Sequence, residues 1–263
     1  MRYFVAALLI VSGAAASRAQ TPAPAASAHF DVASVKPNKS PTPFGYYRPD
    51  PGRLTITNVP VMELAAMAYS MPMLRMDGPE WTRSERYDVI GTYDASKVER
   101  NGWGPMLQHL LEERFALRVH RETRSIPVYV LMKSRADGKL GPQLVSIAPC
   151  TATPPVSLEC ALTFPGSNTI QGPTNWAVAS LRALLEGSLR RTVVDETGLT
   201  GWFDMRLRWS ADPAVDPQAA STPDPDRPIL FTALQEQLGL KLVPAERPLE
   251  VIVIDHVEHA AAD

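Results

Sequence analysis

The chain has 263 residues, 45% of them hydrophobic and 21% charged, so it is long enough to bury a hydrophobic core. Its 26 basic and 28 acidic residues give a formal net charge of −2, and no cluster of lysine and arginine stands out. A nucleic-acid-binding protein usually presents a basic face, so we expect no nucleic-acid partner.

The first 19 residues have the layout of a cleavable signal peptide. Arg2 precedes an apolar run at 3–11, and small residues follow up to Ala19, directly before Gln20. The run is shorter than the ~20 residues that a spanning helix needs, and no later stretch is apolar enough to cross a membrane. We therefore expect a periplasmic or secreted protein with no stable membrane insertion after cleavage. An uncleaved N-terminal anchor is the alternative. Cleavage would remove Arg2 and Arg18 and leave 24 basic and 28 acidic residues, a net charge of −4.

Ordered structure is expected to begin after a Pro/Ala linker at 20–28, which cannot pack a core. Residues 30–35 alternate apolar and polar, as a half-buried strand does. A second low-complexity stretch at 212–227, rich in Pro and Asp, is interpreted as an exposed loop inserted before the last helix.

An internal repeat is the most informative pattern. Residues 105–119 align without gaps onto 228–242, and the offset of 123 continues through Val128/Val251 and Leu131/Ile254. Upstream, 87–93 match 203–209 at an offset of 116, and 55–57 with 61–69 resemble 169–171 with 176–185. We interpret the pattern as a tandem duplication of one supersecondary unit.

Each copy is predicted to read strand, helix, strand, strand, helix, strand, strand, which favours an α+β fold of two similar two-layer lobes. Pro105 suits a first helical turn, and the following helix carries an apolar stripe made of Met106, Leu107, Leu110, Leu111 and Phe115. The runs at 128–132 and 251–254 are typical of buried strands. We place the first lobe at 29–140, a connecting segment at 141–167, the second lobe at 168–259 and a tail at 260–263.

The two cysteines, Cys150 and Cys160, lie close together in the connecting segment, between prolines. In an oxidising compartment an even, closely spaced pair predicts a local disulfide. Two free thiols are the alternative. A metal site is not expected here, because no histidine or further cysteine lies at ligand spacing.

The histidines give no strong metal or catalytic motif. His109, Glu112 and Glu113 resemble the H-x-x-E-H zinc motif, but its last position is Glu, so a solvated helix face is favoured. At residues 255–259, period two would place His256 and Glu258 on one face of a strand and Asp255 and His259 on the other. That division favours a frayed tail or an edge strand. We assign no catalytic residue, no metal ligand and no cofactor.

The tryptophans are candidates for stacking on a sugar or peptide. Trp202 and Trp209 lie in or beside a repeated strand and are expected in the core. Trp103, in a loop before the repeated helix, is the best candidate for an exposed binding side chain.

Four stretches carry a resemblance to a known family. They are 30–37, Gly78-Pro79-Glu80-Trp81 with Tyr87-Asp88-Val89, Met106 through Tyr129, and 194–201 with 203–204 and 254–258. Together they resemble an uncharacterised family of secreted proteins from acidobacteria of the Solibacter type. The resemblance implies no established activity. Similar domains of unknown function are fused to membrane metallopeptidases of the BlaR kind, but this chain has no peptidase portion. The repeat unit also resembles, more loosely, the short N-terminal domain of secretins and TonB receptors.

Two function classes follow. The favoured one is a non-catalytic interaction or ligand-binding protein, whose sheet edges and inter-lobe groove bind an unknown protein or peptide by strand addition. The alternative is an extracellular or periplasmic hydrolase with its site between the lobes. A deep cleft lined by His120, Glu122 and Asp195 would favour the hydrolase.

Overall fold

The structure, a computed structural model of the chain, describes residues 29–42, 44–96, 98, 102–149, 162–166, 168–175, 180–212 and 224–260. The predicted signal peptide at 1–19, the linker at 20–28, Cys150, Cys160 and Trp176 lie outside these residues. The described part contains helices and three four-stranded sheets, so the predicted mixed α+β class is confirmed. In that part, no helix is both long and apolar enough to span a bilayer.

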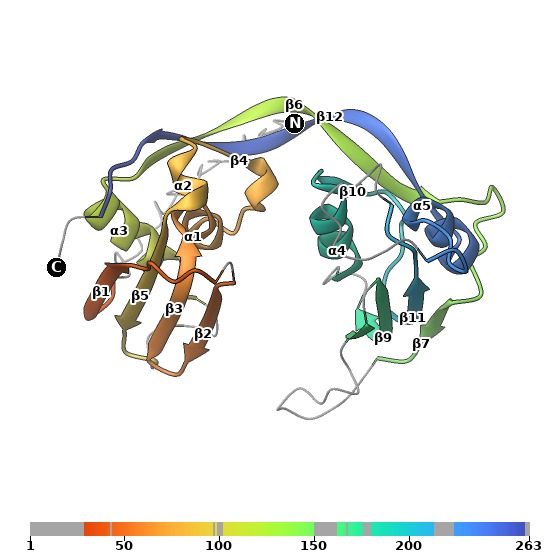
Figure 1. Cartoon of the computed structure of the whole chain (residues 1–263), viewed down its shortest axis with the longest axis horizontal. Coiled ribbons are helices and arrows are strands. Elements are labelled where there is room, and N and C mark those ends of the chain that lie inside the picture. The colour runs from red at the N-terminus through yellow and green to blue at the C-terminus, as the bar shows by residue number, and fades with distance from the viewer. Residues whose placement is uncertain are drawn as a thin grey trace, which may run out of the picture.

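The first body is built on an antiparallel sheet of order β1-β5-β3-β2 (Figure 1). Its strands are β1 (Val32–Pro37), β2 (Tyr46–Asp50), β3 (Arg53–Pro60) and β5 (Arg86–Thr92). Its helices are α1 (Val61–Ala68), the 3₁₀ turn η1 (Met73–Arg75), α2 (Trp81–Ser84) and α3 (Gly104–Phe115). Alternate residues of β3, Leu54 and Ile56, are fully buried in one cluster with α1 and α3. One face of the sheet therefore carries the core.

Helix α3 agrees with the sequence pattern. All five residues of the predicted stripe are buried, and they are Met106, Leu107, Leu110, Leu111 and Phe115. The helix ends at Ala116, which adopts the left-handed conformation (φ 49°) usual for a residue that terminates a helix.

The second body has an antiparallel sheet of order β7-β11-β9-β8. Its strands are β7 (Leu144–Ile147), β8 (Thr163–Gly166), β9 (Thr169–Asn175) and β11 (Trp202–Arg208). Its helices are α4 (Ser180–Leu189), α5 (Leu230–Ala233) and the π-helical turn η4 (Leu234–Leu238), which continues α5. Phe203, Met205 and Leu207 alternate along β11 and are buried against these helices in a second cluster.

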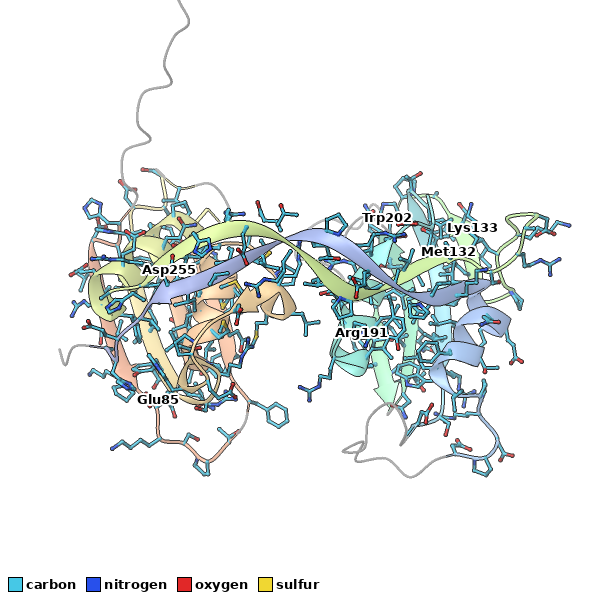
Figure 2. All side chains as sticks on the ribbon, turned by 90° about the horizontal axis from the view of Figure 1, so that it is seen from above. Glu85, Met132, Lys133, Arg191, Trp202 and Asp255 are labelled. Carbon is cyan, nitrogen blue, oxygen red and sulfur yellow. The ribbon has the colours of Figure 1, made fainter. Side chains whose placement is uncertain are left out.

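Two long antiparallel strands, β6 (Arg118–Lys133) and β12 (Leu240–His256), connect the bodies, and we call the pair the ribbon. Both bodies lie on the same side of the ribbon (Figure 1). Seen from above, Asp255 lies over the first body, and Met132 and Lys133 lie over the second (Figure 2). A short parallel strand flanks each end: β4 (Met76–Asp77) beside β12 and β10 (Val193–Asp195) beside β6.

The ribbon contributes to both cores. Ile252 and Ile254 of β12 belong to the first cluster, whereas Leu131 of β6 and Leu240 of β12 belong to the second. The bodies therefore exchange strands: the strand that follows α3 ends in the second body, and the strand that follows η4 ends in the first. The lobe boundaries predicted from the sequence stay a prediction.

The sequence predicted two strands after each second helix, whereas each pair is one continuous strand, and three prolines lie within the ribbon without breaking it. Pro127, Pro244 and Pro248 pair with Glu246, Tyr129 and Ser125. The N–H of Tyr129 points out of the ribbon and donates to the carbonyl of Thr192 (2.9 Å). Because hydrogen bonding alternates along an antiparallel pair, all three prolines occupy outward-facing positions that give no ladder hydrogen bond.

Candidate functional site

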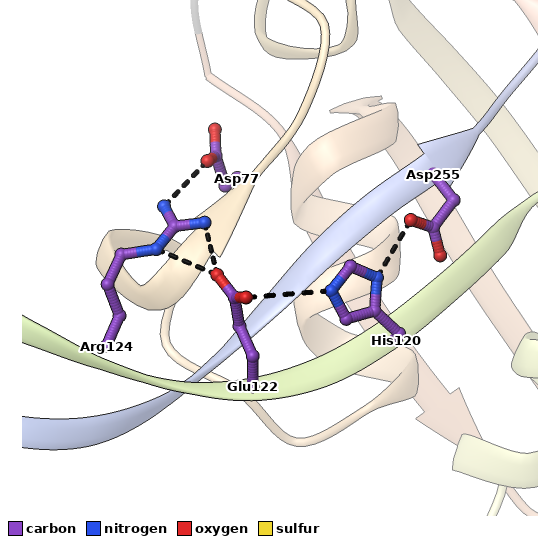
Figure 3. Close-up of polar contacts among 5 residues, drawn as sticks. All are labelled: Asp77, His120, Glu122, Arg124 and Asp255. Carbon is purple, nitrogen blue, oxygen red and sulfur yellow. Dashed lines mark hydrogen bonds and ion pairs between the residues drawn. The ribbon is translucent and has the colours of Figure 1, made fainter.

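A row of charged side chains lies on the outer face of the ribbon, over the first body (Figure 3). His120, Glu122 and Arg124 alternate along β6 and so share one face. Asp77 of β4 and Asp255 of β12 join the row at its two ends. The sequence analysis named His120 and Glu122 together with Asp195, and considered Asp255 separately; the pairing of β6 with β12 brings Asp255 to His120 and Glu122.

The row is a continuous chain of polar contacts. His120 Nδ1 lies 2.8 Å from Asp255 Oδ1, and its Nε2 lies 3.8 Å from Glu122 Oε2. The Arg124 guanidinium donates to Glu122 through Nε (2.9 Å) and to Asp77 Oδ2 through Nη1 (2.9 Å). The hydrogen bond from Arg124 lowers the pKa of Asp77 below its usual value.

Only Nδ1 of His120 is within hydrogen-bond distance of a carboxylate, because Nε2 lies 3.8 Å from Glu122. His120 lines none of the three hollows that the described residues form. The side chain is 49% exposed, whereas catalytic groups are usually perturbed by burial in a cleft. The row is therefore an ion-pair network on a solvated strand.

Asp195 does not join His120 and Glu122. It pairs with Leu131, nine residues beyond Glu122 on β6, which corresponds to about 30 Å along an extended strand. Its carboxylate accepts a hydrogen bond from the N–H of Thr197 (2.8 Å). The cleft that would have favoured a hydrolase is not formed by these three residues. Three hollows that the described residues line each belong to a single body.

The C-terminal segment is not frayed. Among the described strands, β6 alone pairs with the last residues of β12, since β4 pairs only with Ile252 and Val253, and the residues after β12 contact the first body. The N–H of Glu258 donates to the carbonyl of Phe115 (2.7 Å), and His259 bonds Glu85 (2.9 Å) while stacking on Trp81 at 4.3 Å. His256 bonds Glu258 (2.9 Å) while Asp255 faces His120, and the predicted alternation does not extend to Glu258 and His259, because β12 ends at His256.

No group of three or more histidine, cysteine or acidic side chains that could hold a metal ion occurs among the described residues. His109, Glu112 and Glu113 are exposed on α3, as expected for a solvated helix face, and His109 has an edge contact with His29 at 6.2 Å.

Trp103 is buried, so the prediction that it is an exposed binding residue was wrong. It lies directly before α3 and joins the first cluster, with its ring 6.1 Å from that of Tyr47. The physical reason is its position at the end of a helix whose apolar stripe faces the core. Trp209 is buried as expected, and Trp202 is half-buried.

Three exposed aromatic side chains lie instead where the chain passes from the β1–β2 connection into β2. Phe44 is in the connection, and Tyr46 and Tyr47 are the first residues of β2, whose side chains point to opposite faces. Phe44 is 81% exposed, Tyr46 60% and Tyr47 56%. We call residues 38–42 and 44–47 the aromatic loop. Exposed aromatic side chains such as these are candidates for an interaction site, because contiguous apolar surface on a protein often marks one.

The aromatic loop is held by the buried side chain of Asn58 on β3. The Asn58 amide donates to the carbonyls of Thr42 (2.8 Å) and Phe44 (2.9 Å). Its own N–H donates to Asp88 Oδ1 (2.8 Å), which also accepts from Asn38 (2.7 Å). Asn58 has φ 57°, a conformation that asparagine tolerates better than most residues. One partly buried polar network, centred on the buried Asn58, thus holds the loop at Asn38, Thr42 and Phe44.

A family model with the description "Protein of unknown function (DUF3738)" matches residues 62–257. The match covers more than half of the chain, from the second residue of α1 through the second body and the whole ribbon. The chain belongs to the DUF3738 family. No curated protein and no solved structure matches it.

The aromatic loop precedes the segment that matches DUF3738, and it was not predicted from the sequence. A signal was present: Phe44, Tyr46 and Tyr47 follow one another closely between Pro41 and Pro49. Adjacent residues of a strand point to opposite faces, so Tyr46 and Tyr47 cannot both enter one core. The sequence does not show that this segment is held in place, because Gly45 resembles an ordinary turn glycine. Its close approach to Asn58 is visible only in the structure.

Proposed function

We propose that this DUF3738 protein is an exported, non-catalytic interaction protein that binds its partner through the aromatic loop. The observation that carries the proposal is the exposure of Phe44, Tyr46 and Tyr47 on a loop that a buried asparagine holds in place. Aromatic side chains dominate the energetics of protein interfaces because they bury a large area at a low cost in side-chain entropy.

Fixing the loop before binding adds to affinity, because less conformational freedom is lost on association. The carbonyl oxygen of Asn58 lies only 2.4 Å from where a Cβ on Gly45 would be, so the loop is packed against β3 without room for a side chain there. Binding by strand addition to the ribbon is less favoured, because Pro127, Pro244 and Pro248 remove outward-facing N–H donors from its edges.

Export to the periplasm or the medium is part of the proposal, supported by the signal-peptide pattern at residues 1–19. An oxidising compartment would suit a disulfide between Cys150 and Cys160. Acidobacterial origin, and kinship with domains fused to BlaR-type metallopeptidases, are supported by the four stretches of resemblance in the sequence.

We also propose that the two bodies arose by tandem duplication. Support comes from equivalent registers: Met76 of β4 pairs with Ile252, and Val193 of β10 pairs with Tyr129, the repeat equivalent of Ile252 at the offset of 123. The same offset relates Ala116 and Gly239, which terminate equivalent helices in the left-handed conformation. A duplicated unit that exchanges its last strand would produce this pattern.

A pull-down from periplasmic extract tests the interaction, with the mature protein as bait. The comparison is a triple variant, Phe44→Ser, Tyr46→Ser and Tyr47→Ser, in which we expect capture of the partner to fall at least tenfold. The control replaces two exposed apolar residues elsewhere on the first body, Val32→Ser and Leu74→Ser, and should capture the partner as the wild type does.

A further variant, Asn58→Gly, keeps the aromatic side chains but removes the hydrogen bonds that fix the loop, and we expect weaker capture. Equal capture by the wild type and the triple variant would contradict the proposal. Turnover of a cell-wall or peptide substrate, with no partner recovered, would replace it with the hydrolase.

A further inference from the structure

The outer face of β11 carries two arginines at alternate positions. Arg206 and Arg208 are both exposed and, being two residues apart on one strand, point to the same side about 7 Å apart. In the part of the chain that the structure describes, neither has an acidic partner within ion-pair distance, whereas the exposed arginines Arg48, Arg121, Arg124 and Arg135 do. Guanidinium groups that form no ion pair among the described residues can bind an anion, although Asp204, Asp224 and Asp226 line the same hollows.

The backbone beneath these arginines is fixed. The N–H of Arg206 donates to the carbonyl of Gln143 (2.9 Å). The side-chain amide of Gln237 bonds both backbone groups of Arg208, accepting from its N–H (2.9 Å) and donating to its carbonyl (2.7 Å). Hydrogen bonds therefore fix the backbone at both positions, which sets where the two guanidinium-bearing side chains start.

Two adjoining hollows surround the pair. One, of about 530 Å³, is lined by Arg206, Arg208 and Arg227, with Asp224 and Asp226 beside them. Arg227 forms an ion pair with Asp224 (2.9 Å) that orients it. The second hollow, of about 430 Å³, shares Gln143 and Arg206 with the first and extends along the sheet to Gln171, Thr163 and Asp204.

The chemistry of this face combines a cationic centre with neutral and acidic hydrogen-bonding groups. Guanidinium groups bind carboxylates and phosphates through paired N–H donors. Amides can both donate to and accept from hydroxyls, and carboxylates such as Asp204 and Asp226 accept hydrogen bonds from them. A simple anion would use only the arginines, whereas a sugar acid would use the whole face.

We propose that the outer face of β11 binds an acidic saccharide, with its carboxylate between Arg206 and Arg208 and its hydroxyls on the neighbouring amide and carboxylate groups. This inference rests on the proposed function, since it assumes a binding protein, but it concerns a different body of the molecule from the aromatic loop. It names a second ligand class for the same protein.

Isothermal titration of the mature protein with tetragalacturonate tests the inference. We expect saturable binding to the wild type and a loss of at least tenfold in affinity for the double variant Arg206→Gln, Arg208→Gln. The matched control is Arg53→Gln, an exposed strand arginine in the first body, which should bind as the wild type does. Circular dichroism checks that the double variant unfolds at the wild-type midpoint.

Two further probes identify the chemistry. A neutral tetrasaccharide should bind at least tenfold more weakly than tetragalacturonate, because it lacks the carboxylates. Inorganic phosphate and a short single-stranded DNA should also bind more weakly, because they lack the sugar hydroxyls or the matching shape. Equal affinity for phosphate or for DNA would overturn the saccharide assignment, and equal binding by the double variant would overturn the site.

The failure of this inference is distinguishable from that of the proposed function. If tetragalacturonate does not bind but the triple aromatic variant still loses the partner, the saccharide site is wrong and the interaction protein stands. If the double arginine variant loses saccharide binding but all aromatic variants capture the partner normally, only the aromatic-loop proposal fails.

Discussion

His120 Nδ1 lies 2.8 Å from Oδ1 of Asp255, so the beginning of β6 is tied to the last residues of β12. The contact follows a bulge between Ile254 and His256, which shifts the register and places the Asp255 carboxylate on the face of His120. Both side chains are about half exposed, whereas Ile252, on the same strand, is fully buried in the first cluster. The end of the ribbon is therefore held by burial, and the polar contact contributes less.

A comparison of Asp255→Asn with Ile252→Ala tests whether burial contributes more to stability than the polar contact does. We expect the aspartate variant to lose less than about 1 kcal/mol of unfolding free energy, because exposed ion pairs are weak. The isoleucine variant should lose about 2–5 kcal/mol, because it creates a cavity between the ribbon and the first body. Urea unfolding followed by tryptophan fluorescence measures both, and a larger loss for Asp255→Asn would contradict the argument.

The ribbon prolines are expected to protect the protein from association through strand edges. In the double variant Pro127→Thr, Pro248→Thr, two outward N–H donors are restored to a solvated pair of strands, which then resembles an unprotected edge. We predict concentration-dependent dimers by analytical ultracentrifugation. Pro105→Thr, on the exposed first turn of α3, is the matched control and should stay in the wild-type state. A monomeric double variant would show that the prolines have no such role.

Trp103 is expected to act through packing alone. Its indole is buried and its Nε1 finds no hydrogen-bond partner among the described residues. Trp103→Phe should therefore keep most of the stability, since the N–H contributes no bond, whereas Trp103→Ala should lose about 3–5 kcal/mol. Chemical unfolding of both variants provides the test. Similar losses for the two would mean that the indole nitrogen has a partner of its own.

The sequence predicted the local elements well because periodicity reflects burial. The stripe on α3, the strands at 128–132 and 251–254, and the buried Trp209 were all expected, and each belongs to an element whose apolar face is visible within a short window. The mixed α+β class followed from the same windows.

Long-range pairing was not predictable in the same way. Nothing local indicates that β6 and β12 pair over their whole length and cross between two bodies, because the register depends on contacts far apart in sequence. The charged row of Asp77, His120, Glu122, Arg124 and Asp255 exists only through that pairing. Arg206 and Arg208 were not identified from the sequence for a related reason. Alternating arginines on a strand indicate only a solvated face, and the residues that bond their backbone, Gln143 and Gln237, are distant in the sequence.

The pH dependence of stability should reveal the Asp77–Arg124 contact. Arg124 lowers the pKa of Asp77 below its ordinary value of 3.8, so the folded state gains stability above that pH and loses it as the pH falls through the lowered pKa. Asp77→Asn should therefore be slightly less stable than the wild type at pH 6, and the difference should shrink in acid below pH 3.8. In an Arg124→Gln background the difference should become smaller, because only the Gly78 N–H and the charge of Arg83 then lower the pKa of Asp77. A difference as large as in the wild-type background would contradict the role of Arg124.

Replacing a glycine by alanine should have opposite effects on stability at Gly187 and at Gly141. Gly187 lies on the exposed side of α4, and no atom lies within 4 Å of the place that a Cβ would occupy, so Gly187→Ala should stabilise the protein by about 0.5–1 kcal/mol through helix propensity. A Cβ on Gly141 would lie 2.3 Å from the carbonyl oxygen of Gln237, where the chain after β6 passes the end of η4. Because that atom belongs to the backbone, Gly141→Ala must displace η4 and should cost about 1–3 kcal/mol. Thermal unfolding of the two variants gives shifts of opposite sign if the packing is as described, and a Gly141→Ala variant as stable as the wild type would show that the loop yields without cost.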